Sequence, residues 1–196
     1  MLELRKLATV LSGVTIREDA DGPARFMRLS DLSDLKAGRT PSLARGVVPE
    51  VARALDIEAG DLIVAARGLA TEICVADKAI FGAFVSLDLY LVRPNRAKVD
   101  PQYLFAFLTL PATQAAFAAG KQGSALARLP KDELEKIKVP LPPMQTQRTI
   151  ADLACSFEEE GKIFKKLSDL NFIFGREVVA RAIDAATMTN DKRSHK

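Results

Sequence analysis

The stretch that follows Pro143 constrains the fold more than any other part of the sequence. It contains no proline, and its only glycines are Gly161 and Gly175. From about Gln145 to Asp184 the pattern predicts one helix, roughly 60 Å long at about 1.5 Å per residue. A domain of about 140 residues is too small to cover a helix of this length from end to end. Part of the helix must therefore contact another helix or solvent.

Heptads counted from Ile150 place mainly apolar residues at two core positions of this helix. One column holds Ile150, Phe157, Phe164, Asn171 and Val178, and the other holds Leu153, Glu160, Leu167, Phe174 and Arg181. Seven of these ten residues are apolar, which predicts packing against a second helix. Asn171 would then fix the register, as buried Asn does in coiled coils. In the alternative interpretation, the helix packs on its own domain and Asn171 faces solvent.

The sequence before residue 142 predicts short strands and short helices that are separated by turn residues. The expected strands are Leu7–Leu11, Leu62–Ala66, Ile73–Val75, Phe84–Val92 and Ile137–Leu141, and Phe26–Leu32 is expected to be a strand that runs into a loop. The expected helical segments are Val48–Leu55, a helix from Pro101, Ala112–Ala119 and a turn from Lys131. Without regular βαβ alternation, this order predicts an α+β fold. We expect a globular domain over 1–141, the long helix over 142–185 and a disordered polar tail over 186–196.

This chain lacks the residues that several classes of enzyme require for catalysis. His195 is the only histidine and lies in the polar tail, so a Ser-His or Cys-His mechanism has no base. No GxxxxGK[ST] or GxGxxG phosphate loop and no zinc-ligand spacing are present, so we expect no metal and no cofactor. Carboxylates such as Asp31 and Asp34 fit a turn, and Glu158–Glu160 fit a solvated helix face. We therefore expect no catalytic residue and no enzymatic activity.

The sequence favours a cytoplasmic protein. The N-terminus lacks the apolar core of a signal peptide, and no apolar run approaches the ~20 residues of a membrane span. Cys74 and Cys155 are far apart and have no metal-ligand spacing, as expected of reduced, packed thiols.

The junction from Leu134 to Ile150 resembles the end of a target-recognition domain in the DNA specificity subunits of type I restriction-modification systems. In that family a short strand ending in Pro-Leu-Pro-Pro leads into a spacer helix that carries Gln and then an apolar residue. Pro140-Leu-Pro-Pro143, Gln147 and Ile150 match this pattern. Gln145 and Thr146 stand where acidic residues are usual, a departure at the helix start.

Four upstream segments resemble the same family in the same order, so the resemblance covers nearly the whole chain. They are Leu7–Gly13, Phe26–Asp31, Gly60–Ile63 with Arg67-Gly68, and Pro101–Leu110 with Gly123-Ser124. Typical members carry two recognition domains and two spacer helices in a chain about twice as long. The resemblance thus implies a half-subunit form, and we expect a homodimer on a palindromic, interrupted site. The helix residues expected in the dimer or partner contact are Ile150, Leu153, Phe157, Phe164, Leu167, Asn171, Phe174 and Val178.

The resemblance also implies partners. They are double-stranded DNA, a DNA methyltransferase (modification) subunit that binds S-adenosylmethionine, and, as a further candidate, a restriction subunit. In an alternative hypothesis, the chain is a coiled-coil adaptor or antagonist that binds the methyltransferase subunit without reading DNA. This alternative shares the helix and differs in the loops.

DNA contacts require residue types that occur in two acid-poor parts of the chain. Arg, Lys, Ser and Thr bind phosphates, while Arg reads guanine and Gln or Asn reads adenine. No acidic residue lies between Lys36 and Val48, or from Pro101 to Lys131. The candidate DNA-binding residues come from these two parts, from the first turn and from the loop after Ala66. They are Arg17, Arg39, Thr40, Ser42, Arg45, Arg67, Lys121, Gln122, Ser124 and Arg128. In the alternative interpretation, each of these residues taken singly is an ordinary solvated surface residue.

Overall fold

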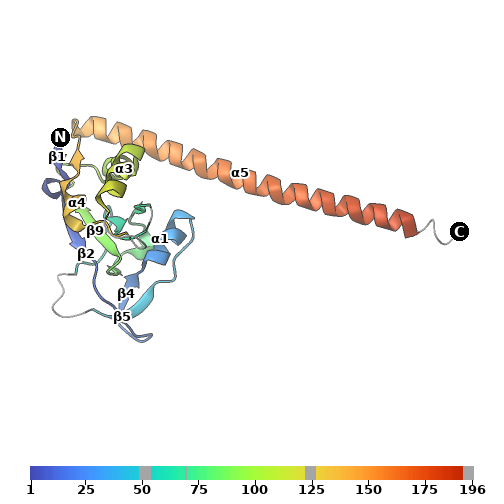
Figure 1. Ribbon diagram of the computed structural model, residues 1–196, viewed down its shortest axis with the longest axis horizontal. Coiled ribbons are helices and arrows are strands. Elements are labelled where there is room, and N and C mark those ends of the chain that lie inside the picture. Colours follow the sequence, from blue (N-terminus) through green and yellow to red (C-terminus); the bar gives the residue numbers. More distant parts are fainter. Residues whose placement is uncertain (49–53, 69, 122–126, 192–196) are drawn as a thin grey trace. The chain divides into compact units, whose positions relative to one another are not determined.

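A computed structural model describes residues 1–48, 54–68, 70–121 and 127–191, with side chains up to residue 183. The chain divides into two units, Met1–Asp152 and Leu153–Lys196 (Figure 1). In chain order the elements are β1 (Leu2–Glu3), the 3-10 helix η1 (Leu4–Lys6), β2 (Ala8–Ser12), β3 (Arg17–Glu18), β4 (Ala24–Met27), α1 (Leu29–Lys36), β5 (Ala44–Val47), β6 (Leu62–Ala65), β7 (Ile73–Val75), the 3-10 helix η2 (Lys78–Ile80), β8 (Phe84–Val85), β9 (Leu89–Pro94), α2 (Pro101–Thr109), α3 (Pro111–Gly120), α4 (Lys131–Lys136), β10 (Lys138–Val139) and α5 (Met144–Asp191).

The central layer of the first unit is an antiparallel sheet in the order β2-β9-β6-β7. Every residue of β6 is buried, because the sheet is covered on both faces. Leu62 and Val64 pack in one hydrophobic cluster with α2, α3 and α4. Ile63 and Ala65 pack in a second cluster with residues of α1 and β8. The continuous apolar run of β6 is the pattern of such a doubly covered strand, and the predicted strand is confirmed.

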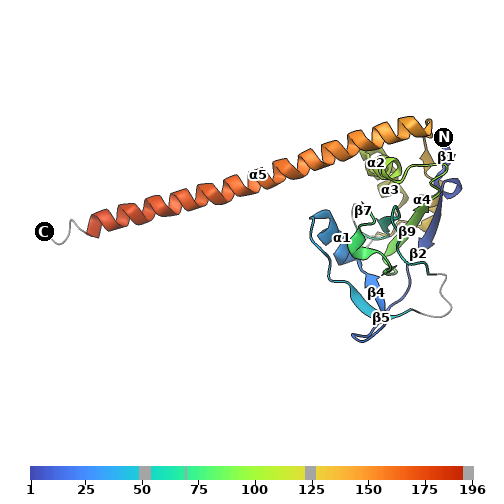
Figure 2. The ribbon, with the colours of Figure 1, turned by 180° about the vertical axis from the view of Figure 1, so that it is seen from behind.

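A smaller sheet in the order β3-β5-β4-β8 lies at one end of this unit, while α2 and α3 lie at the other (Figures 1 and 2). Its β4 and β8 strands are parallel, and its other pairs are antiparallel. A third, two-stranded sheet joins β1 to β10. Together with the long C-terminal helix, these sheets and helices confirm the predicted α+β class.

Helices α2 and α3 begin at Pro101 and Pro111, in positions where a missing N–H costs nothing. Asp100 caps α2 by accepting from the backbone N–H groups of Gln102 (2.9 Å) and Tyr103 (3.1 Å). Among the described residues, no single helix has the length and apolar character of a membrane span. Only α2 and α3 taken together meet those two criteria, with a bend of 69° between them.

Some sequence expectations were wrong in their details. Phe26–Leu32 does not run from a strand into a loop, because β4 ends at Met27 and the helix α1 begins at Leu29. The cause is local: the Asp31 carboxylate accepts from the backbone N–H of Arg28 (2.7 Å) and so satisfies a donor at the helix start. Phe84–Val92 is two strands, because β8 pairs in the small sheet and β9 in the central one. The helix expected over Val48–Leu55 falls largely on residues 49–53, outside the described residues.

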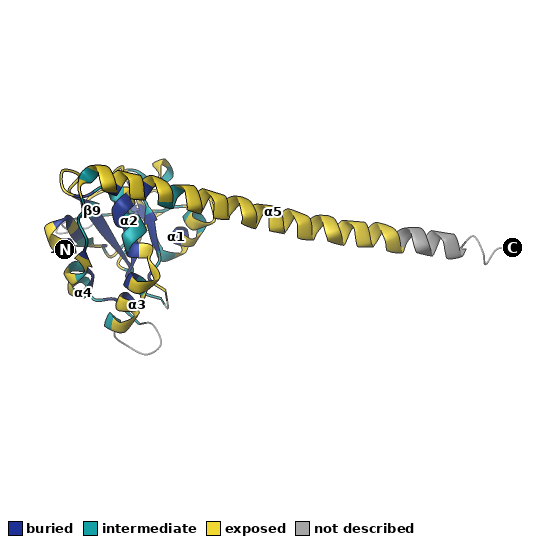
Figure 3. Ribbon diagram, turned by 90° about the horizontal axis from the view of Figure 1, so that it is seen from above, coloured by how far each residue is buried: buried dark blue, intermediate teal, exposed yellow. Residues whose placement is uncertain are grey.

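Helix α5 starts at Met144, directly after the Pro142-Pro143 pair, and continues to Asp191. It therefore includes residues 186–191, which we expected to lie in the disordered tail. The sequence explains this extension, since neither proline nor glycine interrupts the chain after Gly175. The large apolar residues of the helix from Leu153 to Ile183 are exposed, and Figure 3 shows this part of the helix in the colour of exposed residues.

Gln147 fixes the first turn of α5 within the first unit. Its side chain is 1% exposed. The amide oxygen accepts from the backbone N–H of Asp100 (2.9 Å), and the amide nitrogen donates to the carbonyl of Pro142 (2.9 Å). The glutamine of the Pro-Leu-Pro-Pro junction thus joins the helix start to the start of α2.

We predict that Gln147→Leu lowers the free energy of unfolding by about 1–3 kcal/mol, because it removes the side-chain partner of a partly buried N–H and of a partly buried carbonyl. The matched control is Gln145→Leu, at an exposed position of the same turn, which should change stability by less than about 0.5 kcal/mol. Urea unfolding of both variants measures the difference. Equal effects of the two substitutions would contradict a positioning role for Gln147.

Candidate nucleic-acid interface

Three arginines project from one face of the small sheet. Arg25 on β4 is directly opposite Arg45 on β5, and Arg17 on β3 is opposite Val47 on β5. Because side chains alternate along a strand, Arg45 and Val47 share a face, and the register adds Arg17 and Arg25 to it. All four residues are exposed. We call this set, Arg17, Arg25, Arg45 and Val47, the arginine face.

The arginine face lacks carboxylate partners. Among the residues that the structure describes, no acidic group forms an ion pair with Arg17, Arg25 or Arg45. The Arg25 guanidinium instead donates to the carbonyl of Phe81 (2.5 Å). Glu18 follows Arg17 on β3 and therefore belongs to the opposite face, where it pairs with Arg28 (3.5 Å). The sheet thus presents unneutralised positive charge on one side.

The loop after α1 holds Arg39, Thr40 and Ser42, all exposed. Unlike the arginines of the small sheet, Arg39 has a carboxylate partner. Its Nη2 and Nε atoms lie 2.6 and 3.0 Å from the same Asp34 oxygen. Asp34 precedes the acid-free interval that begins at Lys36, so that interval alone could not predict this partner. Much of the charge of Arg39 is therefore already neutralised within the protein.

A second basic group gathers Arg67, Lys121 and Arg128 from distant parts of the chain. Arg67 and Arg128 form an isolated antiparallel bridge, and Lys121 Nζ donates to the Gly68 carbonyl (2.7 Å). Burial lowers the pKa of Lys121 below its usual value. Asp88 pairs with Arg67 (2.9 Å), so the group keeps a positive excess. Gly68 has a φ of 111°, a left-handed conformation that favours glycine at this turn.

The remaining DNA-binding candidates, Gln122 and Ser124, lie outside the described residues. Arg128 also has contacts within the protein: it donates to the Leu87 carbonyl (3.2 Å), and its guanidinium lies 5.7 Å from the centre of the Tyr90 ring. The candidates therefore fall into the small-sheet arginines, the Arg39 loop and the Arg67 group.

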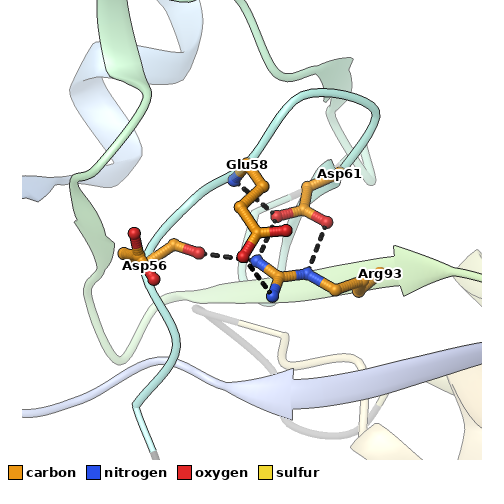
Figure 4. Close-up of polar contacts among 4 residues, drawn as sticks. All are labelled: Asp56, Glu58, Asp61 and Arg93. Atoms are coloured by element: carbon orange, nitrogen blue, oxygen red, sulfur yellow. Dashed lines mark hydrogen bonds and ion pairs between the residues drawn. The ribbon is translucent and has the colours of Figure 1, made fainter.

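The Gly60-Asp61 motif has a structural role in this unit (Figure 4). The Asp61 side chain is 2% exposed, and its two oxygens accept from Arg93 Nε (2.9 Å) and Nη2 (2.8 Å). It also accepts from the backbone N–H of Glu58 (2.8 Å). These hydrogen bonds to Asp61 raise the pKa of Arg93 above its usual value. The motif holds the turn before β6 against β9 and contributes no free charge for a ligand.

Sequence reasoning missed Arg25 and Val47. Arg25 lies in the segment Ala24–Met27, whose pairing with β5 cannot be seen in the local sequence. Val47 is an exposed apolar residue beside two arginines, and only the register shows that they share a face. No three His, Cys, Asp or Glu side chains gather as a metal site within the described ranges. Cys74 is buried, and burial raises the pKa of its thiol to about 12.

Three solved structures from type I restriction-modification systems share this architecture. The S subunit from M. genitalium aligns with a TM-score of 0.57 at 12% identity, over 81% of this chain and 38% of that one. The HsdS subunit from Thermoanaerobacter tengcongensis aligns with a TM-score of 0.62 at 18% identity, over 84% and 38%. A chain from a study of type I R-M complex assembly aligns with a TM-score of 0.65 at 18% identity, over 84% and 39%.

The sequence itself gives the family. Residues 47–170 match the type I restriction modification DNA specificity domain, and the chain belongs to this family. It is also 31% identical over 87 residues to a putative type I restriction enzyme MjaX specificity subunit from Methanocaldococcus jannaschii. That alignment covers 43% of this chain and 20% of the relative. The chain thus spans about two fifths of the length of the aligned structures and one fifth of this relative.

Proposed function

We propose that the chain is the DNA-recognition part of a type I methyltransferase or restriction complex, without catalytic activity of its own. The observation that carries the proposal is the arginine face, where three exposed arginines lie without carboxylate partners among the described residues. Such a surface suits the polyanionic backbone and the acceptor-rich base edges of DNA. Membership of the DNA specificity domain family supports the same conclusion.

We also propose that two copies pair through α5. The apolar heptad residues are exposed to a large extent, with Phe157 at 64%, Phe164 at 62% and Phe174 at 66%. A soluble helix rarely leaves such a row of large apolar side chains in water without a partner. A two-fold pair of this chain would place two identical recognition domains on a palindromic, interrupted DNA site.

The spacing of small residues on α5 supports close packing with another helix. Ala154, Gly161, Ser168, Gly175 and Ala182 follow one another at intervals of seven residues. This column adjoins the heptad position of Ile150, Phe157 and Phe164. Small side chains allow helix axes to approach more closely. The two glycines lower helix propensity by about 1 kcal/mol each, which a packing role would explain.

The proposed partners follow from this function. A modification subunit would bind S-adenosylmethionine and perform methylation, and a restriction subunit would perform cleavage. The chain would supply the DNA sequence preference to both. In the alternative hypothesis the chain is an adaptor or antagonist of the methyltransferase, which is consistent with the exposed apolar row of α5 but leaves the arginine face unexplained.

The test compares DNA affinity with and without the arginine face. We predict that Arg17→Gln/Arg45→Gln, in a complex with the modification subunit, weakens binding to duplex DNA by about tenfold or more for each arginine. Fluorescence anisotropy over a range of salt concentrations measures this loss. The control Arg5→Gln/Lys136→Gln removes two exposed charges that already have carboxylate partners, Glu3 and Asp132. If the arginine variant forms the complex and binds DNA as tightly as the wild type does, the result favours the adaptor hypothesis.

A further inference from the structure

The arrangement of the arginine face is unfavourable for the isolated protein. Like charges directly opposite one another on antiparallel strands destabilise a sheet, and such positions lie only about 4.5–5.5 Å apart. Arg25 and Arg45 occupy this relation, and Arg17 is a diagonal neighbour of Arg45, about 7–8 Å away by sheet geometry. Acidic residues elsewhere neutralise arginines such as Arg28, Arg39 and Arg93. Within the described ranges the arginine face has no such ion pair, which points to an external anionic or acceptor-rich ligand.

The nearby carboxylate of Asp19 does not fill this gap. The backbone N–H of Asp19 donates to the Arg45 carbonyl (3.0 Å), so the register brings Asp19 beside Arg45. Its side chain, however, accepts from the backbone N–H of Asp21 (3.0 Å) and closes its own turn. The Arg45 guanidinium is thus left for a ligand.

Two glycines, Gly22 and Gly46, allow the backbones of the small sheet to approach one another closely. A Cβ added to Gly22 would lie 2.5 Å from the backbone of Gly46. One added to Gly46 would overlap the carbonyl oxygen of Arg17. The backbones of β3 and β5 and of the turn before β4 therefore approach one another closely. This packing holds the arginine-bearing segments in a narrow ribbon.

The chemistry of the face distinguishes base edges from phosphates. A phosphate-binding surface needs only positive charge and N–H or O–H donors. Here an exposed valine, Val47, lies between Arg17 and Arg45. Arginine forms paired hydrogen bonds to O6 and N7 of guanine, and an apolar side chain contacts the methyl group of thymine. Both groups are accessible in the major groove of DNA, which is wide enough to admit a two-stranded β-ribbon.

We infer that the β3–β5 ribbon is a base-reading element, in which Arg17 and Arg45 contact guanines and Val47 contacts a thymine methyl group in the major groove. Arg25 is a positioning residue: its bond to the Phe81 carbonyl fixes its guanidinium beside the segment that leads into β8. The inference rests on the proposed function as a DNA-recognition chain and specifies which part of the surface carries sequence preference.

Selection from a pool of duplexes with randomised sequence tests this inference. The full chain in complex with the modification subunit is the bait, and the recovered DNA is sequenced. Glutamine pairs with adenine as arginine pairs with guanine. Arg45→Gln should therefore change one guanine of each half-site to adenine, by a preference ratio of about tenfold. Arg17→Gln should do the same at a different position, and Val47→Ala should weaken a thymine preference near them.

The controls separate the possible failures. Arg5→Gln replaces an exposed arginine that already pairs with Glu3, and it should recover the wild-type motif. Thermal unfolding of each variant checks that the fold is intact. If Arg45→Gln, Arg17→Gln and Val47→Ala all recover the wild-type motif in lower yield, the face binds phosphates and the inference is wrong. If the wild-type complex enriches no motif at all, the proposed function fails and the inference fails with it.

Discussion

Replacing Phe164 and Leu167 with alanine is expected to convert the proposed dimer into monomers. Both side chains lie in the apolar heptad columns of α5 and are 62% and 61% exposed in the single chain. Truncation of a buried Leu or Phe costs at least about 2 kcal/mol. Each residue occurs in both copies, so the expected loss of association free energy is on the order of 8 kcal/mol. Sedimentation equilibrium over a range of protein concentrations measures the change.

The matched control for this prediction is Lys162→Ala/Lys166→Ala. These lysines lie on the polar side of the same helical turns, and alanine preserves helix propensity. This control should keep the wild-type association state. Two results would contradict the proposed role of the apolar heptad residues of α5. One is a wild-type chain that remains monomeric at working concentrations, and the other is a Phe164→Ala/Leu167→Ala variant that still forms dimers.

Asp61→Ala should produce the largest loss of stability from a single polar residue in the first unit. The substitution removes the two carboxylate oxygens that accept from Arg93 Nε and Nη2, and with them the acceptor of the Glu58 backbone N–H. Breaking a buried ion pair on one side costs about 3–5 kcal/mol. We expect about 3 kcal/mol here, because Arg93 is partly exposed and keeps Glu58 and the Asp56 carbonyl as partners. Urea unfolding monitored by circular dichroism gives this value.

Two further variants show whether the loss comes from the buried pair. Glu58→Gln removes a carboxylate that is 59% exposed, and an exposed ion pair contributes at most about 1 kcal/mol. The double variant Asp61→Leu/Arg93→Leu removes both charges of the pair and should recover part of the stability lost in Asp61→Ala. Equal losses for Asp61→Ala and Glu58→Gln would show that Asp61 does not hold this turn.

The sequence predicts those parts of the fold that depend on local signals. The absence of proline and the apolar heptads predict α5, and the continuous apolar run predicts the doubly covered strand β6. The helix α1 was missed because an alternating pattern from Phe26 masked a helix start at Leu29. The relevant signal was present in Asp31, whose carboxylate accepts from the backbone of Arg28. Such a short-range cap can be sought in any sequence.

The candidate site depends on pairing between distant segments, and sequence reasoning could not supply this. Arg17 and Arg45 were selected from separate loops, whereas the structure joins them through β3 and β5. Arg25 became visible only through its register with Arg45. Conversely, Arg39 was selected for its acid-free surroundings, but the end of α1 brings Asp34 to within 2.6 Å of it. Strand register and helix geometry therefore decide which arginines remain available to DNA.

We propose above all that two copies of this chain direct a modification subunit to methylate a specific DNA sequence. The most direct measurement is a map of methylated bases in host DNA when the chain is co-expressed with its modification subunit. We predict a palindromic, interrupted motif that requires both proteins and disappears with Arg17→Gln/Arg45→Gln. Methylation that lacks any motif, or that persists unchanged with the arginine variant in a stable complex, would contradict it.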